Sequence, residues 1–241
     1  METTRLIILI LFLINTIIGG VLTFIHLRSK SPEKKKQLWI KYFFFFLINS
    51  SVICLLQFTQ FWFNFVFVLV LLLGLYEIIN NGIQHWKILI FGLFVYTCIS
   101  FLFVNFIFNT STFGILIVYC FAITFDGFSQ AAGQLFGKFK FVVNTSPNKT
   151  LEGLLGGMLL VFINYFIIFR GQASLPSLFT TLIIVVSYQL GDLLFSVYKR
   201  RVFIKDYSKI IPGHGGVLDR FDSFLVAGCV AYLLKFLAYE I

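Results

Sequence analysis

Long apolar runs separated by short polar loops dominate the hydropathy pattern of this 241-residue chain. Each run approaches the roughly 20 residues that an α-helix needs to cross the hydrocarbon of a bilayer. The eight runs are Leu6–Leu27, Trp39–Leu56, Phe61–Ile79, Trp86–Phe108, Phe113–Leu135, Leu154–Phe169, Leu175–Tyr198 and Phe221–Tyr239. The sixth is short and begins among glycines, so a tilted or re-entrant segment is an alternative there, and nine spans also fit the pattern. We predict an all-α polytopic membrane protein.

Composition supports this reading, because 59% of the residues are hydrophobic and only 12% are charged. A soluble domain would carry about 25% charged residues, so the pattern excludes that class. No long polar stretch separates the spans, which indicates one membrane domain over residues 1–241. Residues 1–120 contribute generic helices, and residues 121–241 hold most of the acids, bases and glycines. The four cysteines lie inside apolar runs without a C-x-x-C pair, as is typical of small buried residues.

Lys and Arg residues predict the orientation of the spans. With eight spans, 16 of the 19 basic residues fall in loops on one side, and Arg5, Arg170 and Lys235 fall on the other. The basic side is expected to face the cytoplasm, in the inner membrane of the cell. The net charge of +9 is then a topology signal and a source of attraction to anionic membrane lipid, and it calls for no nucleic acid.

Four carboxylates lie where the membrane makes them costly. Asp126 and Asp192 lie within spans, about 13 Å and 9 Å from their basic ends at about 1.5 Å per residue. Asp219 and Asp222 open the last span and share one helix face. A charge at this depth costs at least about 2.5–3.5 kcal/mol. We therefore expect these residues to line a polar cavity that opens to the cytoplasm.

Basic residues and glycines near these acids favour a ligand that carries phosphate. The bases are Lys138, Lys149, Lys199, Arg200, Lys205 and Arg220. Carboxylates hold Mg²⁺ through hard oxygen ligands, while Lys and Arg neutralise phosphoryl oxygens. The segment P-G-H-G-G at 212–216 adds backbone N–H groups that can approach phosphate closely.

Two blocks of sequence carry a family resemblance. The first has S-V-Y-K-R at 196–200, K-D at 205–206, P-G-H-G-G at 212–216 and L-D-R-F-D-S at 218–223. The second has Asp126, Gly133, G-K at 137–138 and S-P-N-K-T-L-E-G at 146–153, followed by two glycines at 156–157. Together they span residues 126–223 and resemble the signature of the phosphatidate cytidylyltransferase (CDP-diacylglycerol synthase) family.

The resemblance implies a reaction in which CTP and phosphatidate give CDP-diacylglycerol and pyrophosphate, for phospholipid biosynthesis. It also implies a homodimer, and Mg²⁺ held by Asp192 and Asp219. We expect Asp126 and Asp222 to orient the bases or to hold a second cation. The expected substrate-binding residues are Lys138, Ser146, Lys149, Thr150, Lys199, Arg200, Lys205, His214, Gly215, Gly216 and Arg220.

Three positions depart from the family pattern, and other functions stay open. Gln130 stands where a Tyr is usual, Gln134 where a basic residue is common, and Phe195 where a Glu is usual. One alternative is another CTP-dependent lipid enzyme, such as a polyprenol kinase or an archaeal-type lipid cytidylyltransferase. A cation-coupled transporter and a structural membrane protein are further alternatives. The transporter predicts an internal repeat, and the chain contains none that we detect.

Overall fold

The computed structural model describes residues 2–27, 31–142, 145–146, 149–213 and 215–236. Within these residues the chain forms eight α-helices and no β-sheet, which confirms the all-α prediction. The helices are α1 (Glu2–Leu27), α2 (Pro32–Phe58), α3 (Gln60–Gly82), α4 (Trp86–Asn109), α5 (Thr112–Phe136), α6 (Leu151–Ile168), α7 (Leu175–Arg201) and α8 (Leu218–Phe236). Isolated β-bridges join Lys140 to Thr150 and Ile211 to Gly215 in two of the connections.

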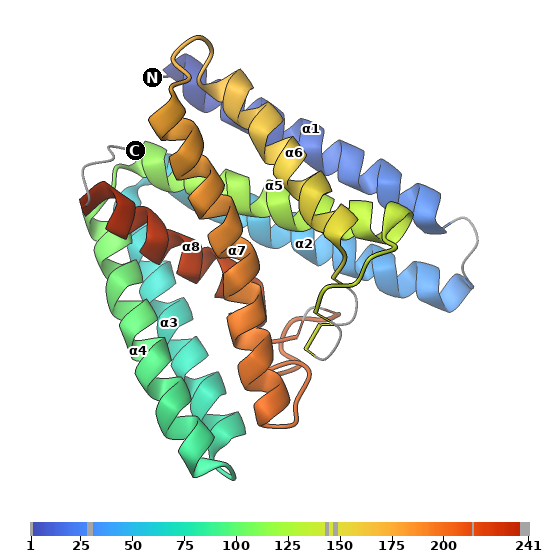
Figure 1. Cartoon of the computed structure of the whole chain (residues 1–241), viewed down its shortest axis with the longest axis vertical. Coiled ribbons are helices and arrows are strands. Elements are labelled where there is room, and N and C mark those ends of the chain that lie inside the picture. Colours follow the sequence, from blue (N-terminus) through green and yellow to red (C-terminus); the bar gives the residue numbers. More distant parts are fainter. Residues whose placement is uncertain (1, 28–30, 143–144, 147–148, 214, 237–241) are drawn as a thin grey trace.

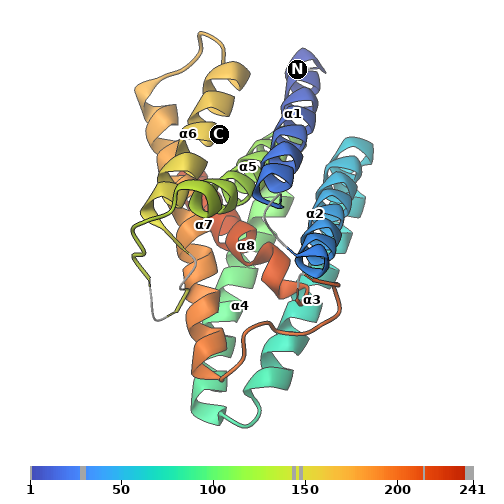
Figure 2. The same cartoon turned by 90° about the vertical axis from the view of Figure 1, so that its right-hand side faces the viewer.

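Seven of these helices, α1 to α7, are long and apolar enough to cross a membrane, so the protein is a multi-pass membrane protein. Helix α8 carries four charged residues, Asp219, Arg220, Asp222 and Lys235, which lipid would not tolerate on an exposed surface. It packs instead against α3, α4, α5 and α7, and Figure 2 shows it crossing the middle of the bundle. Helix α6 is continuous over 18 residues, so the sixth span has no break.

The helices extend past the apolar runs at their basic ends. Helix α2 begins at Pro32, seven residues before the predicted span, and α7 continues to Arg201. A helix can continue past the edge of the hydrocarbon because its backbone hydrogen bonds do not depend on lipid. Pro32 suits the first turn of α2, since an N–H group at that position would have no partner within the helix. At the opposite end of α7, Ser174 and Ser177 form a reciprocal capping box.

The connections alternate between two sides of the bundle, as the basic residues predict. In Figure 1 the α5–α6 and α7–α8 connections lie together at the lower right, whereas the α6–α7 connection lies at the top. The α3–α4 connection lies at the bottom of the same view. The basic residues between α5 and α6 and between α7 and α8 therefore gather at one end of the molecule.

Helices α5 and α6 approach each other closely because glycines form the contact. A Cβ atom on Gly153 would lie 2.6 Å from the carbonyl oxygen of Ser129, and one on Gly156 would lie 2.5 Å from Cβ of Ala132. A Cβ atom on Gly157 would lie 2.9 Å from the carbonyl oxygen of Phe125. Small residues at such spacing let membrane helices pack by backbone contact. The glycines of the sixth span therefore serve helix packing.

We expect Gly157→Ala to destabilise the protein by about 1–3 kcal/mol, because the added methyl group presses on the backbone of α5. The matched control is Gly19→Ala, whose Cβ atom would meet only Tyr42 at 3.9 Å. Thermal unfolding in detergent measures both effects. Equal unfolding midpoints for the two variants would contradict close packing at Gly157.

Candidate active site

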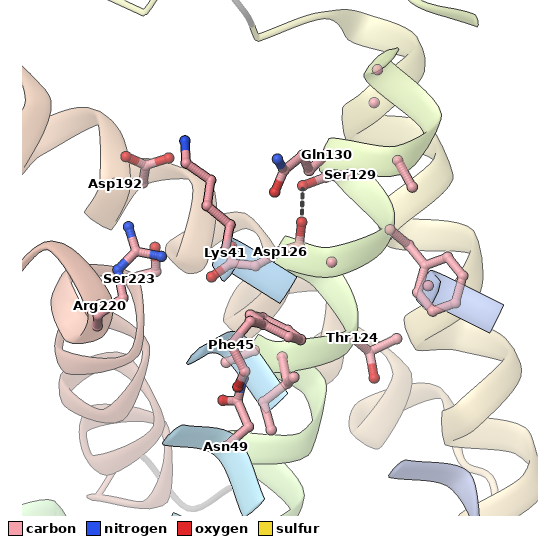
Figure 3. Close-up of a pocket in the computed structure, with 18 of the residues that line it drawn as sticks. Lys41, Phe45, Asn49, Thr124, Asp126, Ser129, Gln130, Asp192, Arg220 and Ser223 are labelled. Carbon is pink, nitrogen blue, oxygen red and sulfur yellow. Dashed lines mark hydrogen bonds between the residues drawn. The ribbon is translucent and has the colours of Figure 1, made fainter. Parts of the chain in front are cut away.

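A cavity of about 800 Å³ lies among α1, α2, α5, α6, α7 and α8. Apolar side chains such as Phe12, Ile48 and Ile123 line it together with amides, hydroxyls, acids and bases. Figure 3 shows Asp126 on α5, Asp192 on α7 and Arg220 on α8 facing this space, and Asn49 and Thr124 farther from these charges. The cavity therefore has a charged part and an uncharged part, and the uncharged part contains both apolar and polar side chains.

All four predicted aspartates line this cavity. Asp126 is exposed to it, Asp192 is half-buried, and Asp219 and Asp222 are buried at the start of α8. Gly191 lets α7 and α8 meet beside them. A Cβ atom there would lie 3.1 Å from Cα of Ser223 and 3.2 Å from the carbonyl oxygen of Asp222. The glycine next to Asp192 therefore allows the acids of two helices to share one cavity.

Asp219 has the most hydrogen-bond partners of the four. Its Oδ1 accepts a hydrogen bond from Lys199 Nζ at 2.6 Å, and its Oδ2 accepts from the backbone N–H groups of Tyr207 and Gly216, both at 2.8 Å. The φ of Gly215 is +85°, and a Cβ atom there would lie 2.6 Å from Asp219 Oδ2. Asp219 thus fixes both ends of the α7–α8 connection, and glycine is needed at 215 for the approach.

Tyr207 lies beside this pair. Lys199 Nζ is 5.3 Å from the centre of the Tyr207 ring, a distance at which a cation is attracted to an aromatic face. Burial raises the pKa of Tyr207 well above its ordinary value, and the nearby carboxylates of Asp222 and Asp219 raise it further. The phenol therefore stays neutral, and its ring covers the buried ammonium of Lys199.

Asp192 connects α7 to the α5–α6 connection. Its Oδ2 forms a salt bridge with Lys149, and its Oδ1 accepts a hydrogen bond from Ser196 Oγ at 3.2 Å. Next to Lys149, the side chain of Thr150 caps α6 by accepting a hydrogen bond from the N–H group of Gly153 at 3.2 Å. Lys149 is thereby held at a helix terminus, where it reaches the aspartate of α7.

The structure brings most of the predicted site residues together. The residues that line the cavity are Asp126, Ser146, Lys149, Thr150, Asp192, Lys199, Asp219, Arg220 and Asp222. Lys138, Arg200, Lys205, Gly215 and Gly216 do not line it, and His214 lies outside the described residues. Arg200 donates hydrogen bonds to the carbonyl oxygens of Thr145 and Ile204, at 3.3 Å and 3.0 Å. It therefore joins two connections.

The three positions that depart from the family pattern divide into two groups. Gln130 and Gln134 line the cavity, so those two changes alter its polar surface. Phe195 is buried against Tyr96 and does not line the cavity. The change at 195 therefore lies outside the cavity lining, although position 195 is only three residues from Asp192 on α7.

Two residues from the N-terminal half contribute to the site, although sequence reasoning assigned them no role there. Lys41 of α2 lines the cavity. Glu77 of α3 is only 2% exposed and accepts hydrogen bonds from Ser208 Oγ at 2.8 Å and from the N–H groups of Val217 and Leu218 at 3.0 Å and 2.9 Å. A carboxylate inside an apolar span is itself a signal, and it could have identified Glu77.

The carboxylates of the cavity can supply only part of a coordination shell for Mg²⁺. Within the described ranges, no three His, Cys, Asp or Glu side chains converge on one point. Mg²⁺, however, needs only one or two carboxylates when phosphates and water complete its shell. A carboxylate offers about four acceptor sites. Asp219 uses three of them on Lys199, Tyr207 and Gly216, so it keeps capacity for a further ligand.

Comparison with known proteins assigns the chain to one group. The model of a family described as the cytidylyltransferase family matches residues 3–238. Proteins named phosphatidate cytidylyltransferase are similar over part of the chain: one from Bacillus subtilis is 43% identical over 114 residues, and one from Staphylococcus haemolyticus is 40% identical over 116 residues. Each alignment covers 45% of this chain, and 42% and 44% of the respective relatives. The similarity thus spans less than half the length of either relative.

We expect Glu77→Ala to lower the free energy of unfolding by about 1–3 kcal/mol, because it leaves buried N–H groups at the start of α8 without an acceptor. Glu33→Ala is the control, since Glu33 is exposed in the first turn of α2 and should contribute about 1 kcal/mol or less. Thermal unfolding in detergent compares the two. A loss no larger for Glu77 than for Glu33 would exclude the capping role.

Proposed function

The chain belongs to the cytidylyltransferase family, and from this we propose that it transfers the cytidylyl group of CTP to phosphatidate, giving CDP-diacylglycerol and pyrophosphate. CTP is the nucleotide from which a cytidylyltransferase takes its group. The acceptor is suggested by the names of the relatives, which align over part of their length. The observation that carries the proposal is a cavity between membrane helices that combines clustered acids and bases with apolar side chains.

Phosphatidate is an amphiphile, with a charged phosphate and apolar acyl chains. Its phosphate would lie near Lys149, Lys199 and Arg220, while its acyl chains would pass apolar side chains such as Phe12 and Ile48. Bases placed beside a reacting phosphate neutralise charge that develops as the leaving group departs. The position of these bases between helices that can span a membrane favours a lipid acceptor over a soluble one.

The chemistry proposed for the site is an in-line displacement. An oxygen of the phosphatidate phosphate attacks the α-phosphorus of CTP, a new P–O–P bond forms, and the bond to the β-phosphate breaks to release pyrophosphate. The phosphate monoester is already largely anionic near neutral pH, so the attack needs no strong general base. Catalysis then rests on positioning and on charge neutralisation by the lysines and arginine.

We propose Asp192 and Asp219 as the residues that would hold Mg²⁺. The ion would supply positive charge to the phosphoryl oxygens when it is bound. The salt bridges of Lys149 with Asp192 and of Lys199 with Asp219 orient both carboxylates at the cavity. We also propose that the basic connections face the cytoplasm, where CTP is available.

Purified protein incubated with α-labelled CTP, Mg²⁺ and phosphatidate should yield labelled lipid. Asp219→Asn should lower the rate at least about a hundredfold, because it weakens the contacts that hold Lys199 and the α7–α8 connection at the site. Glu33→Gln, which changes an exposed acid of α2, is the matched control. A kinase would instead transfer the γ-phosphate of CTP. Folded wild type that labels lipid from γ-labelled CTP but not from α-labelled CTP would therefore favour the kinase alternative.

Removal of divalent metal with a chelator should abolish formation of labelled lipid, and added Mg²⁺ should restore it. The expected loss follows from the need to neutralise the triphosphate before the displacement. The readout is label in the lipid phase at fixed CTP and phosphatidate. Undiminished turnover in the metal-free sample would exclude the proposed roles of Asp192 and Asp219.

A further inference from the structure

Lys41 of α2 reaches the charged part of the cavity. It belongs to the N-terminal half of the chain, to which the sequence analysis assigned no site residue. It lines the cavity together with Asp126, Asp192 and Arg220. Figure 3 shows its side chain extending into the space bordered by Asp192, Arg220 and Gln130. The side chain is exposed to that space. Lys41 is therefore part of the site surface, although the basic stretch around it reads as a membrane anchor.

Lys41 lies farther along α2 than the other lysines of the same stretch. It lies nine residues from the start of α2 at Pro32, about 14 Å at about 1.5 Å per residue. Because α2 begins seven residues before the apolar run at Trp39, Lys41 lies two residues inside that run. Lys34, Lys35 and Lys36 lie before the run and do not line the cavity, whereas Lys41 does.

Two of the other lysines that line the cavity have partners. Lys149 pairs with Asp192, and Lys199 pairs with Asp219. In the part of the chain that the structure describes, the ammonium groups of Lys41 and of Lys140, which also lines the cavity, have neither a salt bridge nor a hydrogen bond. An ammonium group that lines a cavity without a paired anion favours a ligand that brings negative charge.

The α7–α8 connection supports the stem of Lys41. Gly213 has a φ of +73°, and a Cβ atom on it would lie 3.0 Å from Cγ of Lys41. The backbone at Gly213 therefore packs against the aliphatic part of the side chain and restricts where the ammonium can lie. The same connection is held by Asp219 and Glu77, so Lys41 is aligned with the aspartate site.

From these observations we propose that Lys41 binds phosphate oxygens of a substrate in this cavity. This assignment deepens the proposed function, because both the acceptor lipid and CTP carry such oxygens. The shared chemistry is an anionic phosphoryl group in the charged part of the cavity. The ammonium of Lys41 and the guanidinium of Arg220 contact it from α2 and α8, on two sides of the cavity.

Binding of two probes tests the assignment without relying on turnover. The probes are pyrophosphate with Mg²⁺, which represents the nucleotide phosphates, and dioctanoyl phosphatidate, which represents the lipid phosphate. Each stabilises the folded protein according to its affinity, so the unfolding midpoint at increasing concentration gives a Kd. The variants are Lys41→Met, which keeps the stem but removes the charge, and Lys41→Arg, which keeps the charge. Lys36→Met is the control, because it removes an equal charge from the exposed start of α2.

Lys41→Met should weaken binding of at least one probe by roughly tenfold or more, as expected for loss of one charge-assisted hydrogen bond. Lys41→Arg should restore part of that loss, and Lys36→Met should match wild type. Weakening with pyrophosphate alone identifies the nucleotide as the ligand, and weakening with phosphatidate alone identifies the lipid. Equal affinities of Lys41→Met and Lys36→Met for both probes overturn the assignment, as does wild type that binds neither probe.

The outcome is separable from that of the proposed function. Wild type that binds the probes through Lys41 but forms no CDP-lipid would refute the reaction and keep the anion site. Wild type that forms CDP-lipid while Lys41→Met binds both probes normally would keep the reaction and refute the site. Unfolding midpoints of the variants without any probe show whether each is folded, and Lys41→Arg supplies a second test if Lys41→Met is not.

Discussion

The carboxylate of Asp219 is the interaction on which the charged end of the molecule depends. It binds the buried ammonium of Lys199 and the two backbone amides of Tyr207 and Gly216. These contacts join α7, the α7–α8 connection and α8 at one point. A buried charge that lost its partners would be strongly destabilising, so the three elements cannot separate independently. Glu77 adds a second carboxylate from α3, which holds the same connection from the other side of the bundle.

Hydropathy predicts most of the fold, because membrane helices must satisfy their own backbone and must be apolar where they face lipid. That rule identifies α1 to α7 directly. It is weaker at α8, whose charges suit the interior of the bundle rather than a lipid surface. The glycines before and within α6 were visible in the sequence, but their contact with α5 was not. Packing between helices depends on which faces meet, and hydropathy does not carry that information.

Some residues of the site can be predicted from where charges fall in the sequence, and others are found only in the structure. Asp126, Asp192, Asp219 and Asp222 are expensive in a membrane, which makes them conspicuous, and all four line the cavity. Lys138 and Lys205 were selected because they lie near these acids in the sequence, but they do not line the cavity. The hydroxyl of Thr150 caps a helix. Lys41 was hidden within a basic stretch, since a sequence cannot tell which lysine of several turns inward.

The contact between Glu77 and α8 also bears on how the protein is made. Glu77 precedes the amides of Val217 and Leu218 by 140 and 141 residues, so the ribosome completes α3 long before its hydrogen-bond donors exist. During synthesis the nascent α3 must carry a carboxylate without its final partners. Glu77 is five residues from the end of α3 at Gly82, about 8 Å at about 1.5 Å per residue, near enough to the surface to remain hydrated. Arrival of α8 then supplies these donors, so a helix translated well after α3 completes both the packing around Glu77 and the charged part of the cavity.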